Sequence, residues 1–498
     1  MEFLRPPLGL ALRGKEMFGL DDLLATYAPL DSCGRDHPEV RFSEVTTDSR
    51  QCPADSLFVA LPGDHHDGHD FIEEALGRGC RGALARSDRV AEARRDRLGA
   101  RLYEWREARW ICSGPDEAPA VLVLVPDSLQ ALQRLAGRWR SRFSPLVVGI
   151  TGSVGKSTTK EVMAAVLEKE FATLKSLGSY NNEIGLPLTL LQLRPQHQVV
   201  VLEMGTYGPG EITLLAEIAR PRVGVVTNVS HSHLERMHTL DTIAQAKSEL
   251  PAALPLDGLA VLNGDEPLVR AMGSVSRAPV LYYGLGGECR LRATDVRSHG
   301  LEGISFQVRG DGEQRRLRCS LPGRHSVYSA LPAVGVGRYL GMEWQQIEAG
   351  LLDPAARLRL LRVPGVGGST LVDDTYNASP VSCRVALELL AELPGHRIAV
   401  FGDMLELGSF EEEGHRLVGE WAAGVVQELV VLGRHARRTG EAALVKGMPA
   451  DRVHFAESHD EVVRLLKDRL GPDDVVLVKG SRGMEMERIV AALRQEEG

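Results

Sequence analysis

The stretch Gly149-Ile-Thr-Gly-Ser-Val-Gly-Lys-Ser-Thr-Thr-Lys160 carries the strongest structural signal in the chain. The apolar run Pro145–Ile150 predicts a strand that enters a glycine-rich turn, and the residues beyond the turn predict a helix. Backbone N–H groups of such a turn, together with the helix N-terminus, form a cradle for a phosphate group. The spacing is two residues shorter than the common phosphate-loop pattern, but strand, turn and helix all agree.

This loop predicts a site for a nucleoside triphosphate. We expect the Lys156 ammonium to reach the β- and γ-phosphates and the Ser157 hydroxyl to bind Mg²⁺. The glycines let the backbone approach the phosphates without a Cβ in the way. The residues expected to contact ATP are Gly152, Ser153, Val154, Gly155, Lys156, Ser157, Thr158 and, beyond the loop, Asn263.

Two candidate metal-holding residues follow neighbouring apolar runs. Glu203 lies near the end of the run Val199–Met204, and His233 follows the next run, Val223–Asn228. Ligands of α/β proteins bind at the carboxyl ends of parallel strands, so both side chains are expected beside the phosphate loop. Taken alone, Glu203 could equally well be a surface carboxylate, and a histidine such as His233 is more often an ordinary loop residue than a metal ligand.

The rest of the chain alternates short apolar runs with helical stretches, which predicts an α/β fold with parallel sheets. Further strands are expected at Ser56–Leu61, Val121–Val125, Ile398–Gly402, Glu428–Gly433 and Val475–Lys479, and helices at Val162–Glu170 and Ser379–Leu393. Composition places three domains at 1–126, 127–353 and 354–498.

Three local features refine this organisation. Asp127 or Ser128 is expected to cap a helix that opens the second domain. The polar, turn-rich stretch Gly284–Gly323 predicts a β-excursion within that domain. The arginine-rich stretch Arg94–Arg109 predicts a solvated helix or an insertion within the first domain.

Composition excludes several classes of protein. The chain has 498 residues, and its 58 basic and 67 acidic side chains leave a net charge of −9, so no overall field attracts nucleic acid. No apolar run reaches the roughly 18–20 residues of a membrane span, and the N-terminus does not resemble a secretory signal. The seven cysteines form no C-x-x-C pair, which predicts unpaired thiols in a reduced cytoplasm.

Several motifs together resemble the Mur ligases of peptidoglycan synthesis, a family that includes folylpolyglutamate synthase. The phosphate loop, Glu203, His233 and Ala246-Lys-Ser-Glu249 are typical of the whole family. The segments Thr47-Asp-Ser-Arg50, Ser56-Leu-Phe-Val-Ala-Leu61 and Asp67-Gly-His69 resemble the nucleotide-sugar-binding N-terminal domain that the last two members of the pathway share. Four further segments resemble the member that acts last: Asn181-Asn-Glu-Ile-Gly-Leu-Pro187, Asp373-Asp-Thr-Tyr-Asn-Ala-Ser-Pro380, Gly402-Asp-Met-Leu-Glu-Leu-Gly408 and Lys479-Gly-Ser-Arg482. The matches run in order from about residue 46 to 490.

The resemblance implies an N-terminal domain that holds uridine diphosphate, a central P-loop ATPase domain and a C-terminal Rossmann-like domain. It implies a cytoplasmic, ATP- and Mg²⁺-dependent ligase that adds D-alanyl-D-alanine to UDP-N-acetylmuramoyl-tripeptide through an acyl phosphate. A monomer is expected, with no nucleic-acid partner. Whether the tripeptide ends in meso-diaminopimelate or lysine stays open.

The resemblance also assigns roles to individual residues. Those expected to act in catalysis are Lys156, His233, Lys247, Arg357 and Asp374. Those expected to hold metal are Ser157, Glu203, His233 and Lys247, the last as a carbamylated lysine. The resemblance allows for two Mg²⁺ ions at these residues. Those expected to bind substrate are Ser49 and Arg50 on the uridine diphosphate side, Asn182, and Asn377 with the 479–482 loop at the dipeptide end.

Two alternatives remain. One is a related ligase that adds another amino acid, such as the tripeptide-forming enzyme or folylpolyglutamate synthase; segments 373–380 and 402–408 argue against it. The other is a P-loop NTPase with a regulatory role, which would need neither the 47–50 region nor a third domain.

Overall fold

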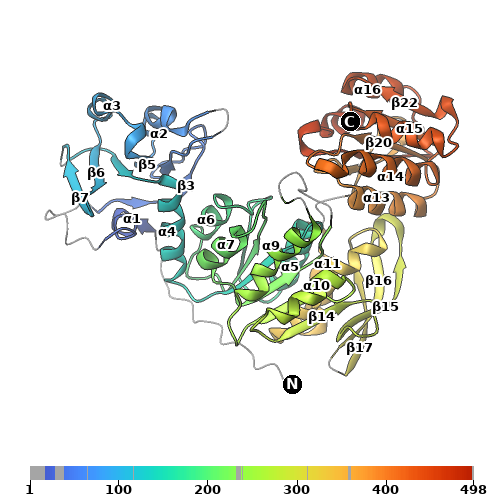
Figure 1. Ribbon diagram of the computed structural model, residues 1–498, viewed down its shortest axis with the longest axis horizontal. Helices are drawn as coiled ribbons and strands as arrows, with labels where there is room; N and C mark the ends of the chain where they lie inside the picture. Colours follow the sequence, from blue (N-terminus) through green and yellow to red (C-terminus); the bar gives the residue numbers. More distant parts are fainter. Residues whose placement is uncertain are drawn as a thin grey trace.

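A computed structural model describes residues 17–28, 39–63, 66–115, 117–230, 237, 239–310, 312–356 and 360–495. Three large β-sheets follow one another along the chain, each with its own helices, and the first and third domains lie on either side of the central one (Figure 1). Each sheet falls within one of the three expected ranges, and the α/β prediction is confirmed. The exact domain limits stay a prediction.

The first domain contains a six-stranded sheet in the order β3-β4-β5-β8-β6-β7, parallel except for the β6–β7 pair. Its strands are β3 (Val45–Thr46), β4 (Leu57–Val59), β5 (Gly82–Arg86), β6 (Arg101–Arg106), β7 (Arg109–Ser113) and β8 (Val121–Val125). The helices are α1 (Leu20–Leu24), α2 (Ile72–Gly77) and α3 (Glu92–Arg97), and a two-stranded sheet joins β1 (Phe18–Gly19) to β2 (Arg41–Phe42).

The prediction for Arg94–Arg109 as one helix or an insertion is wrong. The segment forms the end of α3 and most of the β6–β7 hairpin, which belongs to the sheet. Tyr103 and Trp110 are buried on the inner face of the hairpin, and arginines occupy much of its exposed surface. Because the segment is rich in arginine, its sequence pattern did not indicate that these two aromatic side chains are buried.

Helix α4 (Ser128–Arg140) connects the first domain to the second. Asp127 caps it by accepting a hydrogen bond from the Gln130 N–H at 2.9 Å, as predicted. Leu132 and Leu135 are fully buried in one hydrophobic core that contains side chains of both the first and the central sheet. The connection is therefore a packed helix and not an exposed linker.

The central domain has a nine-stranded sheet in the order β10-β11-β9-β12-β13-β14-β15-β16-β17. Its strands are β9 (Leu146–Thr151), β10 (Thr173–Lys175), β11 (Val199–Glu203), β12 (Val223–Val226), β13 (Leu259–Asn263), β14 (Val280–Gly284), β15 (Leu291–Ser298), β16 (Ile304–Gly310) and β17 (Glu313–Cys319). The sheet is parallel up to β15, and β15–β17 form an antiparallel extension, which confirms the predicted β-excursion.

Helices cover this sheet on both faces (Figure 1). They are α5 (Lys156–Leu167), α6 (Gly185–Leu190), α7 (Glu211–Ala219), α9 (Leu240–Ala252), α10 (Pro267–Ala271), α11 (Val327–Tyr339) and α12 (Trp344–Leu351). Because both faces are covered, the central strands β9, β11 and β12 are entirely buried. This burial explains why their sequences are continuous apolar runs.

The third domain has a six-stranded sheet in the order β18-β19-β23-β20-β21-β22, parallel except for β18. Its strands are β18 (Leu361–Pro364), β19 (Thr370–Asp374), β20 (His396–Gly402), β21 (Glu428–Leu432), β22 (Val453–Ala456) and β23 (Asp474–Lys479). Its helices are α13 (Pro380–Glu392), α14 (Glu411–Ala423), α15 (Arg437–Val445), α16 (His459–Lys467) and α17 (Glu487–Leu493).

Two further expectations can be compared with the described residues. None of the helices in the described ranges combines the length and apolar character that a membrane crossing requires. Cys52, Cys80, Cys289, Cys319 and Cys383 are free thiols, as expected. Cys112 is disulfide-bonded, so the expectation of unpaired thiols is wrong at that position.

Candidate active site

The phosphate loop connects β9 to α5 and takes its shape from two glycines in left-handed backbone conformations. Gly152 has φ +149°, and a Cβ there would lie 1.9 Å from Thr227 Oγ1. Gly155 has φ +86° and precedes the first residue of α5. Within the described chain no side chain caps this helix, so its N-terminal N–H groups and dipole can attract an anion.

Residues that follow β12 hold the loop in place. The Asn228 amide accepts a hydrogen bond from the Val154 N–H and donates one to the Val154 carbonyl, both at 2.8 Å. The Thr227 hydroxyl donates to the same carbonyl at 2.8 Å, and the Ser153 N–H donates to the Asn228 carbonyl at 3.0 Å. The loop is thus rigid on the side that faces away from the cavity.

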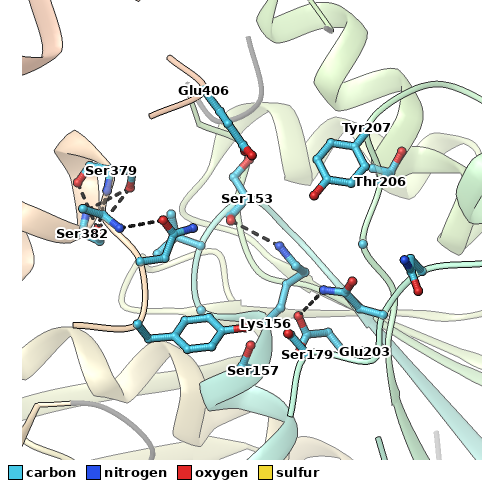
Figure 2. A pocket seen from close by; sticks show the side chains of 18 of the residues that line it. Ser153, Lys156, Ser157, Ser179, Glu203, Thr206, Tyr207, Ser379, Ser382 and Glu406 are labelled. Atoms are coloured by element: carbon cyan, nitrogen blue, oxygen red, sulfur yellow. Dashed lines mark hydrogen bonds between the residues drawn. The ribbon is translucent and has the colours of Figure 1, made fainter. Parts of the chain in front are cut away.

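Lys156 lies at the mouth of the loop, as the sequence predicts. Its Nζ donates hydrogen bonds to the carbonyls of Gly152 at 2.7 Å and Ser153 at 3.3 Å (Figure 2). These bonds hold the ammonium above the turn, where the charge of a phosphate group would be neutralised.

One cavity of about 340 Å³ joins this loop to the third domain. Its lining residues come from five segments. Three belong to the central domain, namely 153–157, 179 with 181–182, and 203 with 205–207 and 211. Two belong to the third domain, namely 376–379 with 382, and 405–407. The predicted site residues among them are Ser153, Val154, Gly155, Lys156, Ser157, Asn182, Glu203 and Asn377. The phosphate loop therefore faces loops at the carboxyl ends of β19 and β20 of the third-domain sheet across a shared space (Figure 2).

Glu203 ends β11 and is almost fully buried in the wall of this cavity. Its Oε1 accepts a hydrogen bond from the Asn181 amide at 2.8 Å, whereas its Oε2 has no hydrogen-bond partner among the described residues. A buried, unsatisfied carboxylate oxygen beside a serine hydroxyl fits a cation site. The described residues contain no group of three or more His, Cys, Asp or Glu side chains that could hold a metal, so Ser157 and Glu203 are the predicted ligands that the structure places at the cavity.

Lys247 is fully buried within α9 and does not line the cavity. Burial lowers the pKa of its ammonium well below the ordinary value, and the positive charge of Lys156 lowers that pKa further. No carboxylate in the described part of the chain forms an ion pair with it. The neutral amine, which is the form that reacts with carbon dioxide, is therefore favoured.

In the third domain, Asn377 lines the cavity but Asp374 does not. Asp374 forms a buried ion pair with Lys479, whose Nζ lies 2.5 Å from Asp374 Oδ2 and also donates to the Asn377 carbonyl at 2.8 Å. This pair joins the carboxyl ends of β19 and β23 beneath the loop that carries Asn377. A direct contact of Asp374 with ATP stays a prediction.

The remaining predicted residues lie elsewhere. Asn263 ends β13, and its amide donates to the Thr227 carbonyl at 2.8 Å, so it supports the loop from behind. Ser49 and Arg50 belong to the first domain, where they pair with Glu74 and Asp48. Thr158 is in the first turn of α5 but not in the cavity wall. His233 and Arg357 lie outside the described residues.

The sequence reasoning missed several residues that line the cavity. They are Ser179, Asn181, Gly205, Thr206, Tyr207, Glu211, Tyr376, Ala378, Ser379, Ser382, Leu405, Glu406 and Leu407. The segments 181–187, 373–380 and 402–408 had been singled out for family resemblance, and that signal already pointed to several of these positions. Only the packing of the domains shows which side chains of each motif face the cavity.

Comparison with known proteins gives three matching family models. They are the Mur ligase family catalytic domain at residues 41–140, the Mur ligase middle domain at 150–337 and the Mur ligase glutamate ligase domain at 357–482. The UDP-N-acetylmuramoyl-tripeptide–D-alanyl-D-alanine ligase of Bacillus subtilis is 34% identical over 90% of this chain and 92% of its own length. Its Escherichia coli counterpart is 33% identical over 92% of this chain and 95% of its own length.

Solved structures of Mur ligases are also similar to this chain. A MurF crystal structure from Acinetobacter baumannii is 26% identical and superposes with a TM-score of 0.80, over 96% of this chain and 98% of that one. The MurF ligase of Thermotoga maritima, solved in complex with ADP, is 28% identical with a TM-score of 0.73, over 90% of this chain and 96% of that one.

Proposed function

This chain belongs to the Mur ligase family, and from that membership we propose that it is the ligase that joins D-alanyl-D-alanine to UDP-N-acetylmuramoyl-tripeptide. One observation carries the proposal: a single cavity is lined both by the phosphate loop and by loops of the third domain. An amide ligase needs this arrangement, because ATP and the acceptor amine must meet the same carboxylate.

The reaction has two steps. The terminal carboxylate of the tripeptide attacks the γ-phosphorus of ATP, ADP leaves, and the product is an acyl phosphate. The neutral amine of the dipeptide then forms a bond to the acyl carbon, the C–O bond to phosphate breaks, and one proton leaves the nitrogen as the amide forms. Phosphorylation is required because a free carboxylate has no adequate leaving group. Phosphoryl transfer itself depends on positioning and on neutralisation of charge.

Within this reaction Lys156 neutralises the β- and γ-phosphates, and the loop 152–155 orients them through its backbone. Ser157 and Glu203 hold Mg²⁺, which when bound supplies positive charge at the transferring phosphate. The orphaned Oε2 of Glu203 supports this role. His233 is assigned to the second metal site by family resemblance alone, as is Arg357 to ATP.

Lys247 is carbamylated in this proposal. Its burial and the nearby charge of Lys156 favour the neutral amine, and an added carboxylate would convert a repulsive group into a metal ligand. The first domain, with Ser49 and Arg50, holds the uridine diphosphate end of the substrate, and Asn182 and Asn377 contact its peptide end and the dipeptide. The cytoplasmic location and the monomeric state are further parts of the proposal.

The test is a product assay with ATP, UDP-N-acetylmuramoyl-tripeptides ending in meso-diaminopimelate or lysine, and a panel of dipeptides. We expect phosphate release that depends on both the nucleotide-linked tripeptide and D-alanyl-D-alanine. Lys156→Ala should lose ligation by at least about 10³-fold and keep its fold, because Lys156 supplies charge stabilisation in the transition state. Lys467→Ala, an exposed lysine on α16, is the matched control. Ligation by Lys156→Ala at the wild-type rate would reject the mechanism.

A further inference from the structure

We propose that Lys160 is a positioning residue for the cation site: it holds the loop 176–182, and this loop orients the carboxylate of Glu203. The inference rests on the proposed function, which makes Glu203 a ligand of Mg²⁺. Lys160 is the last residue of the phosphate-loop stretch that begins at Gly149, and neither the spacing of that stretch nor the family resemblance assigns it a role.

Lys160 is a charged side chain that is fully buried. It lies on α5, one helical turn after Lys156, and its side chain is 0% exposed. Lysine is rarely buried to this extent, because the ammonium loses its hydration unless each N–H group has an acceptor. Three acceptors surround its Nζ: the carbonyls of Ser176 at 2.8 Å and Gly178 at 2.6 Å, and Glu161 Oε1 at 2.9 Å. The ammonium is therefore fixed in one place, and it fixes two carbonyls of one loop.

The loop 176–182 follows β10, and the packing of its own side chains does little to hold it. Residues 177–180 are all exposed, Leu177 by 54% and Tyr180 by 46%. A segment with so little buried apolar surface moves readily unless hydrogen bonds restrain it. The two hydrogen bonds from Lys160 supply that restraint, and they join the start of the loop to the helix that carries the phosphate-loop lysine.

The same loop holds Glu203 through two hydrogen bonds. The Glu203 N–H donates to Ser176 Oγ at 3.3 Å, and the Asn181 amide donates to Glu203 Oε1 at 2.8 Å. The second of these bonds leaves Oε2 of the carboxylate without a hydrogen-bond partner in the described chain. Asn181 thus determines which oxygen is available to a cation, in the cavity wall that also contains Ser179 (Figure 2).

Asn181 lies in a close fit against the segment that follows Glu203. The Gly205 N–H donates to the Asn181 carbonyl at 2.8 Å, and a Cβ at position 205 would lie 2.9 Å from Asn181 Oδ1. A small shift of the loop would therefore break the hydrogen bond between Asn181 and Glu203. Residues that orient a metal ligand in this way commonly set the affinity of the site for its metal.

Lys160 acts through the loop and not by contact with a substrate, since it is not among the described residues that line the cavity. Lys175 provides a matched comparison. Its Nζ lies 2.6 Å from Glu161 Oε2, so it pairs with the same glutamate through the other oxygen. It is 29% exposed, and within the described residues it makes no hydrogen bond to the carbonyls of the loop 176–182.

The first experiment measures cation binding without turnover. Mn²⁺ is titrated into the full-length protein with a saturating, non-hydrolysable ATP analogue, and enzyme-bound Mn²⁺ is followed by electron paramagnetic resonance. Lys160→Met removes the ammonium but keeps an unbranched side chain, and it should raise the dissociation constant of Mn²⁺ by about 10-fold or more. Lys175→Met should bind Mn²⁺ as the wild type does.

Hydrogen–deuterium exchange shows whether the effect passes through the loop. In Lys160→Met, the peptide that covers 176–182 should lose protection, whereas peptides from β9 and β11 should exchange as in the wild type, because these strands stay packed. Faster exchange across the whole central sheet would show that Lys160 only stabilises the domain, and this result would overturn the inference.

The second experiment replaces Asn181 with leucine, which removes the amide and keeps a side chain of similar size. Asn181→Leu should also weaken Mn²⁺ binding by about 10-fold. If Lys160 acts through Asn181, the double variant should lose clearly less than the roughly 100-fold that two independent effects would give. A full multiplication of the two losses would overturn the inference. If Lys160→Met fails to fold, wild-type Mn²⁺ affinity in Asn181→Leu would overturn it as well.

The outcomes separate this inference from the proposed function. If the wild type ligates the dipeptide and binds Mn²⁺, and Lys160→Met binds Mn²⁺ with unchanged affinity, the inference is wrong and the proposed function stands. If the wild type ligates the dipeptide without binding Mn²⁺, Glu203 is not a cation ligand and the inference is wrong. If the wild type forms no ligation product, the proposed function fails, and the inference fails with it.

Discussion

The buried ion pair between Lys479 and Asp374 makes a quantitative prediction about the third domain. Neither side chain is more than 6% exposed, and their charged atoms are 2.5 Å apart. Removing one partner of such a pair leaves an uncompensated buried charge, which typically costs about 3–5 kcal/mol. Lys479→Met should therefore lower the free energy of unfolding of this domain by about that amount.

The double variant tests the cause. Lys479→Met with Asp374→Asn removes both charges, so no uncompensated charge remains in the core. Its loss of stability should be smaller than the sum of the two single losses by about 2 kcal/mol or more. Exposed Lys446, which pairs with Glu420 at 3.6 Å, is the control, and Lys446→Met should cost less than about 0.5 kcal/mol.

Hydrogen–deuterium exchange of peptides over β19 and β23, measured as a function of urea, reports the stability of this domain directly. The protein has several domains, so a local probe is needed in place of one global transition. A loss below about 1 kcal/mol for Lys479→Met, or strict additivity in the double variant, would refute the reasoning.

Three further predictions concern the loop, the cation site and pH. Gly152→Ala places a Cβ 1.9 Å from Thr227 Oγ1 and should reduce kcat/KM for ATP by about 10²-fold, while Gly137→Ala, where the space is open, should have no effect in the same assay. Glu203→Gln should raise the Mg²⁺ concentration for half-maximal activity at least about 10-fold, and an unchanged Mg²⁺ titration would exclude Glu203 as a ligand. Burial lowers the pKa of His325 to about 4, below its value of about 6.5 in the unfolded chain. The free energy of unfolding therefore contains the full contribution of the neutral imidazole above about pH 6.5. That contribution, at most about 3 kcal/mol, is lost as the pH falls toward 4. Urea midpoints at pH 7 and pH 5 should differ less in His325→Gln than in the wild type.

Most strands could be predicted because their environment is simple. Strands such as β9, β11, β12 and β23 lie between two layers of helices, so nearly every side chain is apolar and the run is visible without an alignment. The β6–β7 hairpin could not be predicted in this way. Strand β7 lies at the edge of the sheet, and the buried positions of β6 include Arg101 and Glu104, so apolar and polar residues do not alternate with a clear period.

For the site, the sequence by itself determined the phosphate loop, because a glycine turn between strand and helix is a local structure whose residues are neighbours in the chain. The tertiary structure alone decided which distant groups complete it. In the folded chain, Glu203 has a carboxylate oxygen without a hydrogen-bond partner among the described residues, and Asp374 forms an ion pair with Lys479. Glu406 and Ser153 line the same cavity. These relations depend on how separate sheets and domains pack, and no spacing along the chain records that packing.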